Sequence, residues 1–199
     1  MTPQAEDSAR LQEILGELYA EHAARAETQS AVIDVILARL RCDRVSMWKF
    51  DEVGGKLTLL CFASKTAAGA FDTSERRLHR AEFIDYFNSL VRAGVYMSVD
   101  AMNDPVLQPM RESYLVPNDV VSILDAAFVL NNHTYGMVCC EQNHKREWKT
   151  GDVVSLRAIV NKIALLMWNA PDPVLLKTPS LPLKVLLHRK PVAAIDRRR

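Results

Sequence analysis

The stretch from Ser122 to Gln142 constrains the fold more than any other part of this chain of 199 residues. It contains two apolar, β-favouring runs, Ile123–Leu130 and Tyr135–Cys140, separated by Asn131-Asn132. Asparagine tolerates left-handed backbone angles, so this pair suits a tight reversal that His133-Thr134 completes. Nearly continuous apolar runs are typical of central strands that are covered on both faces. We therefore predict a hairpin in the middle of an antiparallel sheet, with helices on either side.

The residues before this hairpin predict further strands and helices. In order, we expect strands at Val45–Phe50 and Leu57–Phe62, a helix at Glu82–Arg92 that stops at Gly94, a strand at Val95–Val99 and a short helix around Val106–Tyr114. The segment Ala63–Arg80 is small and polar and shows no periodicity. We interpret it as a loop of the kind that covers a pocket.

Ser8 to Leu40 contains no proline and is expected to be helical. The heptad-like positions of its first part are Leu11, Leu15, Leu18, His22 and Arg25. Thr28-Gln29-Ser30 is expected to cap a second helix start, whose wider apolar stripe suits packing on a sheet. The narrow first stripe favours pairing with another helix across a dimer, and an exposed amphipathic arm is the alternative.

The C-terminal helix is expected to start after Thr150, a suitable N-cap, with Asp152 near the positive end of the helix dipole. Its apolar heptad positions are Val153, Leu156, Val160, Ile163 and Met167. We predict that this stripe joins the N-terminal helix in the seam of a dimer. Pro171 ends the helix, and five of the nine prolines lie in the basic tail that follows.

Composition and charge argue against several classes of protein. The chain is 49% hydrophobic and 25% charged, and its net charge of +1 predicts neither a nucleic-acid partner nor a membrane partner. The four cysteines show no CxxC spacing and lie in apolar segments, as buried free thiols do in a reducing compartment. The sequence shows neither a secretory leader nor an apolar run of about 18 residues. We therefore expect a cytoplasmic protein.

Six short stretches occur in a characteristic order between about Thr28 and Met167. They are VSMWKFDE (Val45–Glu52), YFNSL (Tyr86–Leu90), SVDAMNDP (Ser98–Pro105), ESYLVP (Glu112–Pro117), SILDAAF (Ser122–Phe128) and YGMVCCEQ (Tyr135–Gln142). Together they resemble the GAF family of small-molecule sensor domains, in the version found in bacterial signalling proteins. The resemblance implies an α+β fold with a central antiparallel sheet of about five or six strands. The N- and C-terminal helices would lie on one face, and short helices and loops would cover a ligand pocket on the other.

The same resemblance divides the chain into a dimer-forming N-terminal helix (residues 1–27), a GAF-like domain (28–170) and a proline-rich basic tail (171–199). In cyclic-nucleotide-binding GAF domains a signature of Asn-Lys, Phe and Asp-Glu is expected. Here the corresponding residues are Asn143-His144, Trp148 and Asp152-Val153. The lysine and the glutamate are replaced, so a cyclic nucleotide is not expected.

The sequence identifies no cofactor. Bilin attachment would need a cysteine in the pocket loops, whereas Cys61, Cys139 and Cys140 lie on predicted strands. A bilin is therefore not expected. His79, the only histidine in the covering loop, leaves haem ligation open. The remaining histidines show no metal-ligand spacing, so no metal site or catalytic residue is predicted.

The resemblance places six polar residues at or near the pocket side: Tyr86, Asp100, Tyr114, Ser122, Asp125 and Glu141. Convergent hydroxyls and carboxylates in an apolar cleft would orient a small polar ligand. The alternative is a local role, in which Asp100 and Asp104 cap turns and Asp125 satisfies buried backbone amides. Strand alternation puts Ser122 and Asp125 on opposite faces unless a bulge intervenes, so not all six can line one pocket.

Two functions follow from these observations. The first is a non-catalytic sensory domain that binds a small cytoplasmic ligand and relays its state through a helical homodimer to a downstream signalling protein. The second is a protein-interaction scaffold with an empty or vestigial pocket, in which the basic tail contacts a partner. A redox enzyme using Cys139 is a third hypothesis. It is disfavoured because Cys139 and Cys140 are expected to point to opposite faces as buried, poorly reactive thiols.

Overall fold

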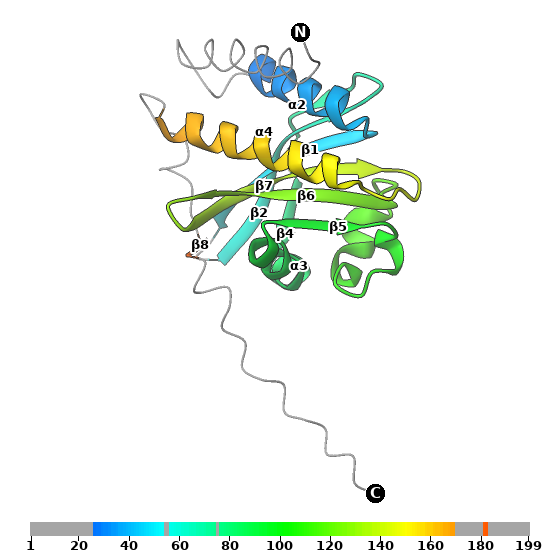
Figure 1. Ribbon diagram of the computed structural model, residues 1–199. Helices are drawn as coiled ribbons and strands as arrows, with labels where there is room; N and C mark the ends of the chain where they lie inside the picture. The colour runs from blue at the N-terminus through cyan, green and yellow to red at the C-terminus, as the bar shows by residue number, and fades with distance from the viewer. Residues whose placement is uncertain (1–25, 54–55, 75, 170–180, 183–199) are drawn as a thin grey trace, which may run out of the picture.

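The computed structural model describes residues 26–53, 56–74, 76–169 and 181–182 (Figure 1). An antiparallel sheet lies between two helical layers, with α2 and α4 on one face and α3 on the other. The helical elements are α2 (Ala26–Leu40), α3 (Arg80–Ala93) and α4 (Thr150–Asn169), with the short segments η1 (Ala101–Asn103), η2 (Gln108–Met110) and η3 (Arg111–Leu115). The predicted helical stretch before residue 26 and most of the predicted tail lie outside the described residues.

The strands follow one another in the sheet in the order β3-β2-β1-β7-β6-β5, with β4 paired to β2 and β8 paired to β7. Their bounds are β1 (Arg44–Val53), β2 (Lys56–Thr66), β3 (Phe71–Asp72), β4 (Arg76–His79), β5 (Val95–Ser98), β6 (Ser122–Leu130), β7 (His133–Gln142) and β8 (Leu181–Pro182). All of these pairings are antiparallel. The predicted α+β fold with a central antiparallel sheet is confirmed.

The β6–β7 hairpin lies at the centre of the sheet, as predicted. Its turn residues Asn131 and Asn132 have φ angles of 47° and 64°, so both adopt the left-handed conformation expected of this pair. His133 and Thr134 belong to β7 and do not complete the turn. Gly136 of β7 lies so close to β1 that a Cβ there would be 2.0 Å from the Trp48 carbonyl oxygen. Only glycine permits this approach of the two strands.

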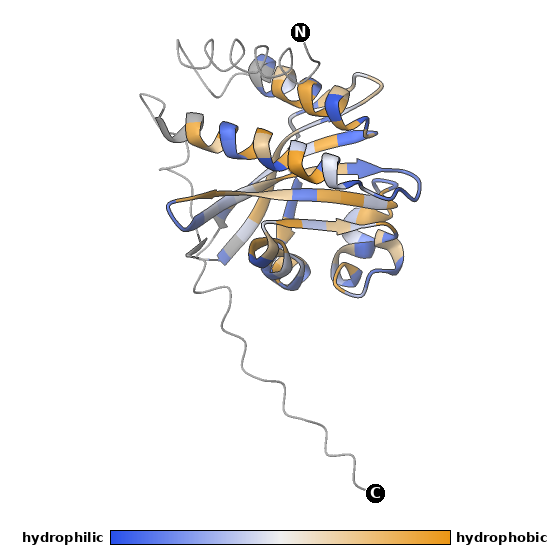
Figure 2. Ribbon diagram, viewed as in Figure 1, coloured by the Kyte–Doolittle hydropathy of each residue, from blue (hydrophilic) through white to orange (hydrophobic). Residues whose placement is uncertain are grey.

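Strand alternation divides the interior into two clusters. On β6, Leu124, Ala126 and Phe128 pack in the cluster under α2 and α4, whereas Ile123 and Ala127 pack in the cluster under α3. Hydrophobic and hydrophilic residues alternate along α2 and α4, as in helices that lay one face on a sheet (Figure 2). The two helical layers are therefore separated by a single sheet.

The heptad stripe of α4 faces this chain's own sheet, which corrects the predicted dimer seam. Leu156, Val160 and Ile163 are 0%, 1% and 3% exposed in the cluster that α4 shares with α2 and the sheet. Heptad spacing alone does not distinguish a stripe that covers a sheet from one that pairs with a second helix. Among the α4 side chains whose burial is described, the large apolar ones that are exposed are Val154 and Leu165, at 57% and 51%.

Helix α3 and its end agree with the prediction. Phe83, Phe87 and Leu90 lie on its buried face, and Gly94 ends it with a left-handed φ of 76°. The predicted covering loop Ala63–Arg80 is wrong in part, because β2 runs to Thr66 and two short strands, β3 and β4, pair with it. In β4 only Leu78 is buried, so the sequence shows no alternation there.

Two smaller predictions also need correction. Thr28-Gln29-Ser30 does not start a helix, because α2 already begins at Ala26 and includes these residues. The Ser30 hydroxyl instead accepts a hydrogen bond from Lys65 Nζ of β2 at 3.0 Å. The short helix expected around residues 106–114 is divided between η2 and η3. Within the described residues, no helix is both long and apolar enough to span a bilayer.

Candidate ligand-binding site

The sheet face under α3 carries an apolar cluster that also includes aromatic rings from several elements. Phe50 of β1 and Phe87 of α3 meet edge to face, with ring centroids 4.8 Å apart, and Phe83 packs beside them. Trp48 of β1 and Tyr114 of η3 make a second edge-to-face contact at 5.3 Å. Such contacts stabilise a specific ring arrangement beyond the burial of apolar area. This chain's own rings therefore occupy the space between the sheet and the covering segments.

A tyrosine and a carboxyl group are buried together in this cluster. The Tyr86 hydroxyl of α3 donates to Asp125 Oδ2 of β6 at 2.5 Å, and both residues are 1% exposed. Burial raises the pKa of Asp125 to about 8, although the Tyr86 hydrogen bond opposes the shift. Burial and the adjacent carboxyl also raise the pKa of Tyr86 well above its usual value. Asp125 Oδ1 is buried without a hydrogen bond of regular geometry to any described residue, although the Cys139 thiol and the Cys140 backbone N–H lie near the carboxyl group and oppose the rise of its pKa.

A second buried carboxylate, Glu141 of β7, connects the cluster to its edge. The Tyr114 hydroxyl donates to Glu141 Oε1, and Arg44 Nε donates to Glu141 Oε2. Burial disfavours the Arg44 cation, but attraction to Glu141 and Tyr114 raises the pKa of Arg44 overall. A carboxylate this deeply buried needs such a partner, and its two oxygens are both occupied.

At the edge of the cluster beside Glu141, which we call the rim, polar side chains border a cavity. The Asn118 side-chain oxygen accepts from Arg76 at 2.8 Å and from Arg44 at 3.3 Å, and its amide group donates to the Tyr114 carbonyl at 2.7 Å. A cavity of about 470 Å³ lies here, with Arg44, Asn118 and Glu141 among the residues that line it. Glu141 therefore borders both the apolar cluster and an open cavity.

Comparison with known proteins identifies the fold. Residues 24–167 match the family model of the GAF domain. The chain belongs to the GAF domain family. A search of curated proteins found no match.

Solved structures with the same fold include domains of photoreceptors and a domain described as part of a sensor histidine kinase. The phycoerythrobilin-bound GAF domain of a cyanobacterial phytochrome superposes with a TM-score of 0.64 at 16% identity, covering 84% of this chain and 95% of that one. The blue-light-absorbing form of the PixJ GAF domain from Thermosynechococcus elongatus gives 0.58 at 18% identity, covering 74% and 89%. A domain described as part of a two-component sensor histidine kinase from Sinorhizobium meliloti 1021 gives 0.54 at 14%, covering 74% and 94%. At these identities the similarity establishes the fold of this GAF domain.

Four of the six predicted site residues meet under α3. They form the two pairs Tyr86–Asp125 and Tyr114–Glu141. Their roles toward a ligand stay predictions, whereas their positions in one cluster are established by the structure.

The other two predicted residues lie elsewhere. Ser122 points away from the Asp125 face, as strand alternation predicts, and its hydroxyl donates to the His144 carbonyl at 3.0 Å. Asp100 accepts from Lys145 Nζ at 2.5 Å near the surface. Both side chains connect segments of this chain, but the Asp100 side chain does not cap the turn that follows it, contrary to the alternative prediction.

Sequence reasoning missed Arg44, the cation that neutralises Glu141. The predicted strand began at Val45, one residue too late, so Arg44 was not placed on any face. Extending the alternation of Trp48 and Ser46 backwards by two residues would have placed Arg44 toward the α3 side. Asn118 had no comparable signal, because its position depends on the turn that follows η3.

The histidine and cysteines considered at the sequence level occupy positions unsuited to cofactor attachment. His79 is exposed at the start of α3, where its backbone N–H donates to Glu82 Oε2 at 2.7 Å, so it does not face the cluster. Cys139 and Cys140 pack in opposite clusters, as predicted, and burial raises the pKa of both thiols. Among the described residues, no three His, Cys, Asp or Glu side chains gather as a metal site would require.

Proposed function

We propose that this GAF domain is a non-catalytic sensory module that binds a small ligand in the cluster under α3. The observation that carries this proposal is the unpartnered Oδ1 of Asp125, buried within an apolar cluster beside Tyr86. A buried polar atom without a partner is costly, and a ligand that supplies the partner recovers that cost. Ligand sites combine apolar walls with a few such polar groups, which fix the orientation of the bound molecule.

The protonation of Asp125 indicates which ligand group would meet it. With a pKa of about 8, this carboxyl is mainly neutral at pH 7. Oδ2 already accepts the Tyr86 hydrogen bond, so the proton belongs on Oδ1. The Oδ1–H of a neutral carboxyl is a hydrogen-bond donor, and a carbonyl oxygen of the ligand is the simplest acceptor for it. The ligand would enter from the rim cavity beside Glu141, past the rings of Trp48 and Tyr114.

The sheet provides a route from this cluster to the opposite helical layer. Asp125 follows Leu124 and precedes Ala126, and both of these side chains pack in the cluster under α2 and α4. A ligand that binds two arrangements of this sheet with different affinity would shift the packing of α4. We propose that the altered packing of α4 is transmitted across a homodimer to a downstream cytoplasmic signalling protein. The exposed Val154 and Leu165 of α4 offer an apolar surface for such a contact.

Native mass spectrometry of the purified full chain tests the ligand. We expect extra mass that is lost under denaturing conditions. The variants Asp125→Leu and Tyr86→Phe should lower its occupancy, because the first removes the donor offered to the ligand and the second removes the hydroxyl that orients this carboxyl. Ser122→Ala is the matched control, since Ser122 lies outside the cluster and should leave occupancy unchanged. Equal occupancy in all three variants would refute the assignment of the site to the α3 side.

The ring packing supports a second candidate, the interaction scaffold with a vestigial pocket. Phe50, Phe87, Trp48 and Tyr114 already fill the cluster with edge-to-face contacts. In that case the purified protein would carry no extra mass, and a partner would be captured through residues 171–199. Deletion of those residues should then abolish capture in a pull-down assay. Capture that survives the deletion would exclude the tail as the binding element.

A further inference from the structure

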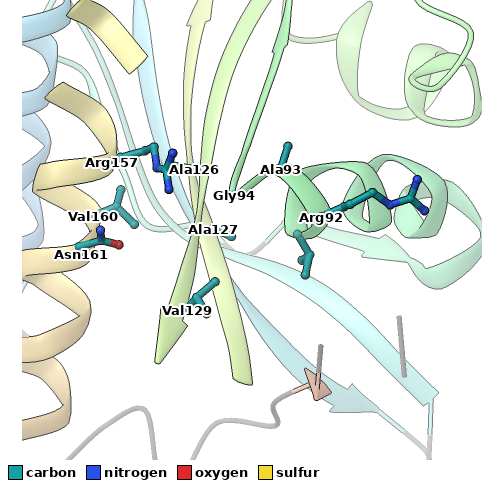
Figure 3. Close-up of a pocket in the computed structure, with 10 residues that line it drawn as sticks. Arg92, Ala93, Gly94, Ala126, Ala127, Val129, Arg157, Val160 and Asn161 are labelled. Carbon is teal, nitrogen blue, oxygen red and sulfur yellow. The ribbon is translucent and has the colours of Figure 1, made fainter. Parts of the chain in front are cut away.

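A second cavity, of about 280 Å³, lies where α3 ends and β5 begins (Figure 3). Its walls come from the C-terminal end of α3, from β6 and from α4. Strand β5 pairs with β6 only as far as Ala126, so the β6 residues beyond it continue without β5 beside them. The cavity thus borders elements from both helical layers, and neither Tyr86 nor Asp125 is among the residues that line it.

One charged side chain, the exposed Arg157, faces this cavity without a partner in the described part of the chain. The Arg157 side chain reaches from α4 toward Ala126 and Gly94 (Figure 3), and its Nη2 lies 3.6 Å from the place where a Cβ on Gly94 would be. No described residue gives this guanidinium a hydrogen bond or an ion pair. Asn161, one helical turn later, lines the same cavity. The guanidinium of Arg92, in contrast, points away from it (Figure 3).

The rest of the lining is apolar and uncharged. Ala127, Val129 and Val160 provide aliphatic surface, and no Asp or Glu is among the lining residues. An unpaired guanidinium over an apolar floor is complementary to a molecule with one negative end and one apolar end. Planar guanidinium groups bind carboxylates through two parallel hydrogen bonds, which an ammonium group does not match.

We propose that this cavity binds a small monocarboxylate with a short apolar body. Arg157 holds the carboxylate, Asn161 supplies a further donor, and the body of the molecule lies against β6. The volume is just below the range of about 300–1,000 Å³ that is usual for ligand pockets, which favours a compact molecule over a nucleotide. The bound molecule would touch both the α3–β5 junction and α4. The site is a second input to the domain and does not depend on a ligand under α3.

A purely structural role for Arg157 makes a different prediction. The C-terminal end of α3 carries partial negative charge, which attracts a cation whether or not a ligand binds. In that case, replacing Arg157 would lower the melting temperature, and no carboxylate would bind to the wild-type protein. Ligand binding and thermal stability must therefore be measured on the same variants.

Titration of the ¹⁵N-labelled full chain with sodium benzoate, followed by NMR, tests the proposal. We expect saturable shifts of the Gly94, Ala127, Val129 and Asn161 amides. Benzyl alcohol, a neutral molecule of similar shape, should bind at least about tenfold more weakly, because it lacks the carboxylate. A benzoate titration without saturable shifts at these amides, or equal binding of the alcohol, would overturn the proposal.

Three arginine variants complete the test. Arg157→Gln should weaken benzoate binding at least about tenfold, whereas Arg92→Gln, the matched control on the same rim, should change it by less than about twofold. Arg157→Lys keeps the charge and loses the planar fork, so it should bind between wild type and Arg157→Gln. Unchanged binding in folded Arg157→Gln or Arg157→Lys would refute the role of Arg157. Benzoate shifts confined to Tyr86 and Asp125 would place the carboxylate under α3 and would also overturn the proposal.

Discussion

Replacing Asp125 by asparagine should change how the stability of this domain depends on pH. The pKa of this carboxyl is about 8 in the folded protein, against about 3.9 in an unfolded chain. Between these values the folded state holds a proton that the unfolded state has released. Stability therefore falls as the pH rises through this window, by about 1.4 kcal/mol per pH unit. Asparagine keeps an acceptor for Tyr86 and removes the titration.

Urea unfolding at a series of pH values measures the effect. Between pH 5 and pH 7, the wild-type protein should lose about 3 kcal/mol of unfolding free energy relative to Asp125→Asn. The difference between the two proteins isolates this carboxyl from all other titrating groups. Glu112→Gln, which changes an exposed carboxylate of η3, should follow the wild-type curve. Parallel curves for wild type and Asp125→Asn would refute the raised pKa and the protonation state assigned to Oδ1.

Three further changes test the fold. Arg44→Gln should lower the unfolding free energy by about 3–5 kcal/mol in urea titrations, because it leaves Glu141 buried without its cation. The double variant with Glu141→Gln should recover much of this loss. A double variant as unstable as the single one would contradict the pairing. Val160→Asp should cost several kcal/mol in thermal melts because Val160 is buried, whereas Ala158→Asp, at an exposed position of α4, should cost less than about 1 kcal/mol, and equal losses would refute the orientation of α4. Gly136→Ala should lower the melting temperature sharply, as followed by circular dichroism, because the alanine Cβ would lie 2.0 Å from a backbone oxygen of β1. A melting temperature equal to that of the wild type would show that the two strands do not approach so closely.

The sequence predicts the central hairpin and α3 because their signals are local. Two asparagines set the turn, two apolar runs set the strands, and a glycine ends the helix. The short edge strands β3 and β4 carry no such signal, because they bury too few side chains to show alternation. The direction of the α4 stripe is also not local. Its spacing fits a sheet and a partner helix equally well, and only the three-dimensional structure shows that it covers the sheet.

The sequence predicts the part of the candidate site that depends on which face of a strand each residue occupies. Alternation separates Ser122 from Asp125, and the structure agrees. The pairing of Tyr86 with Asp125 depends on where α3 lies over β6, and the sequence contains no measure of that distance. Arg44 was missed because strand ends are the least certain part of such a prediction. The sequence also does not predict the cavity lined by α3, β6 and α4, since its walls come from three separate segments.

Side chains alternate between the two faces of β6 and β7, and this alternation affects how the sequences of such domains can diverge. The α3 layer meets every second residue of these strands, and the α2–α4 layer meets the residues between them. Substitutions at one set of positions can therefore accumulate with little effect on the other set. A change of one residue in the length of a strand would exchange the two sets at once. Binding specificity on one side can thus diversify under point substitution while the helical surface on the other is retained, provided that the strands keep their lengths.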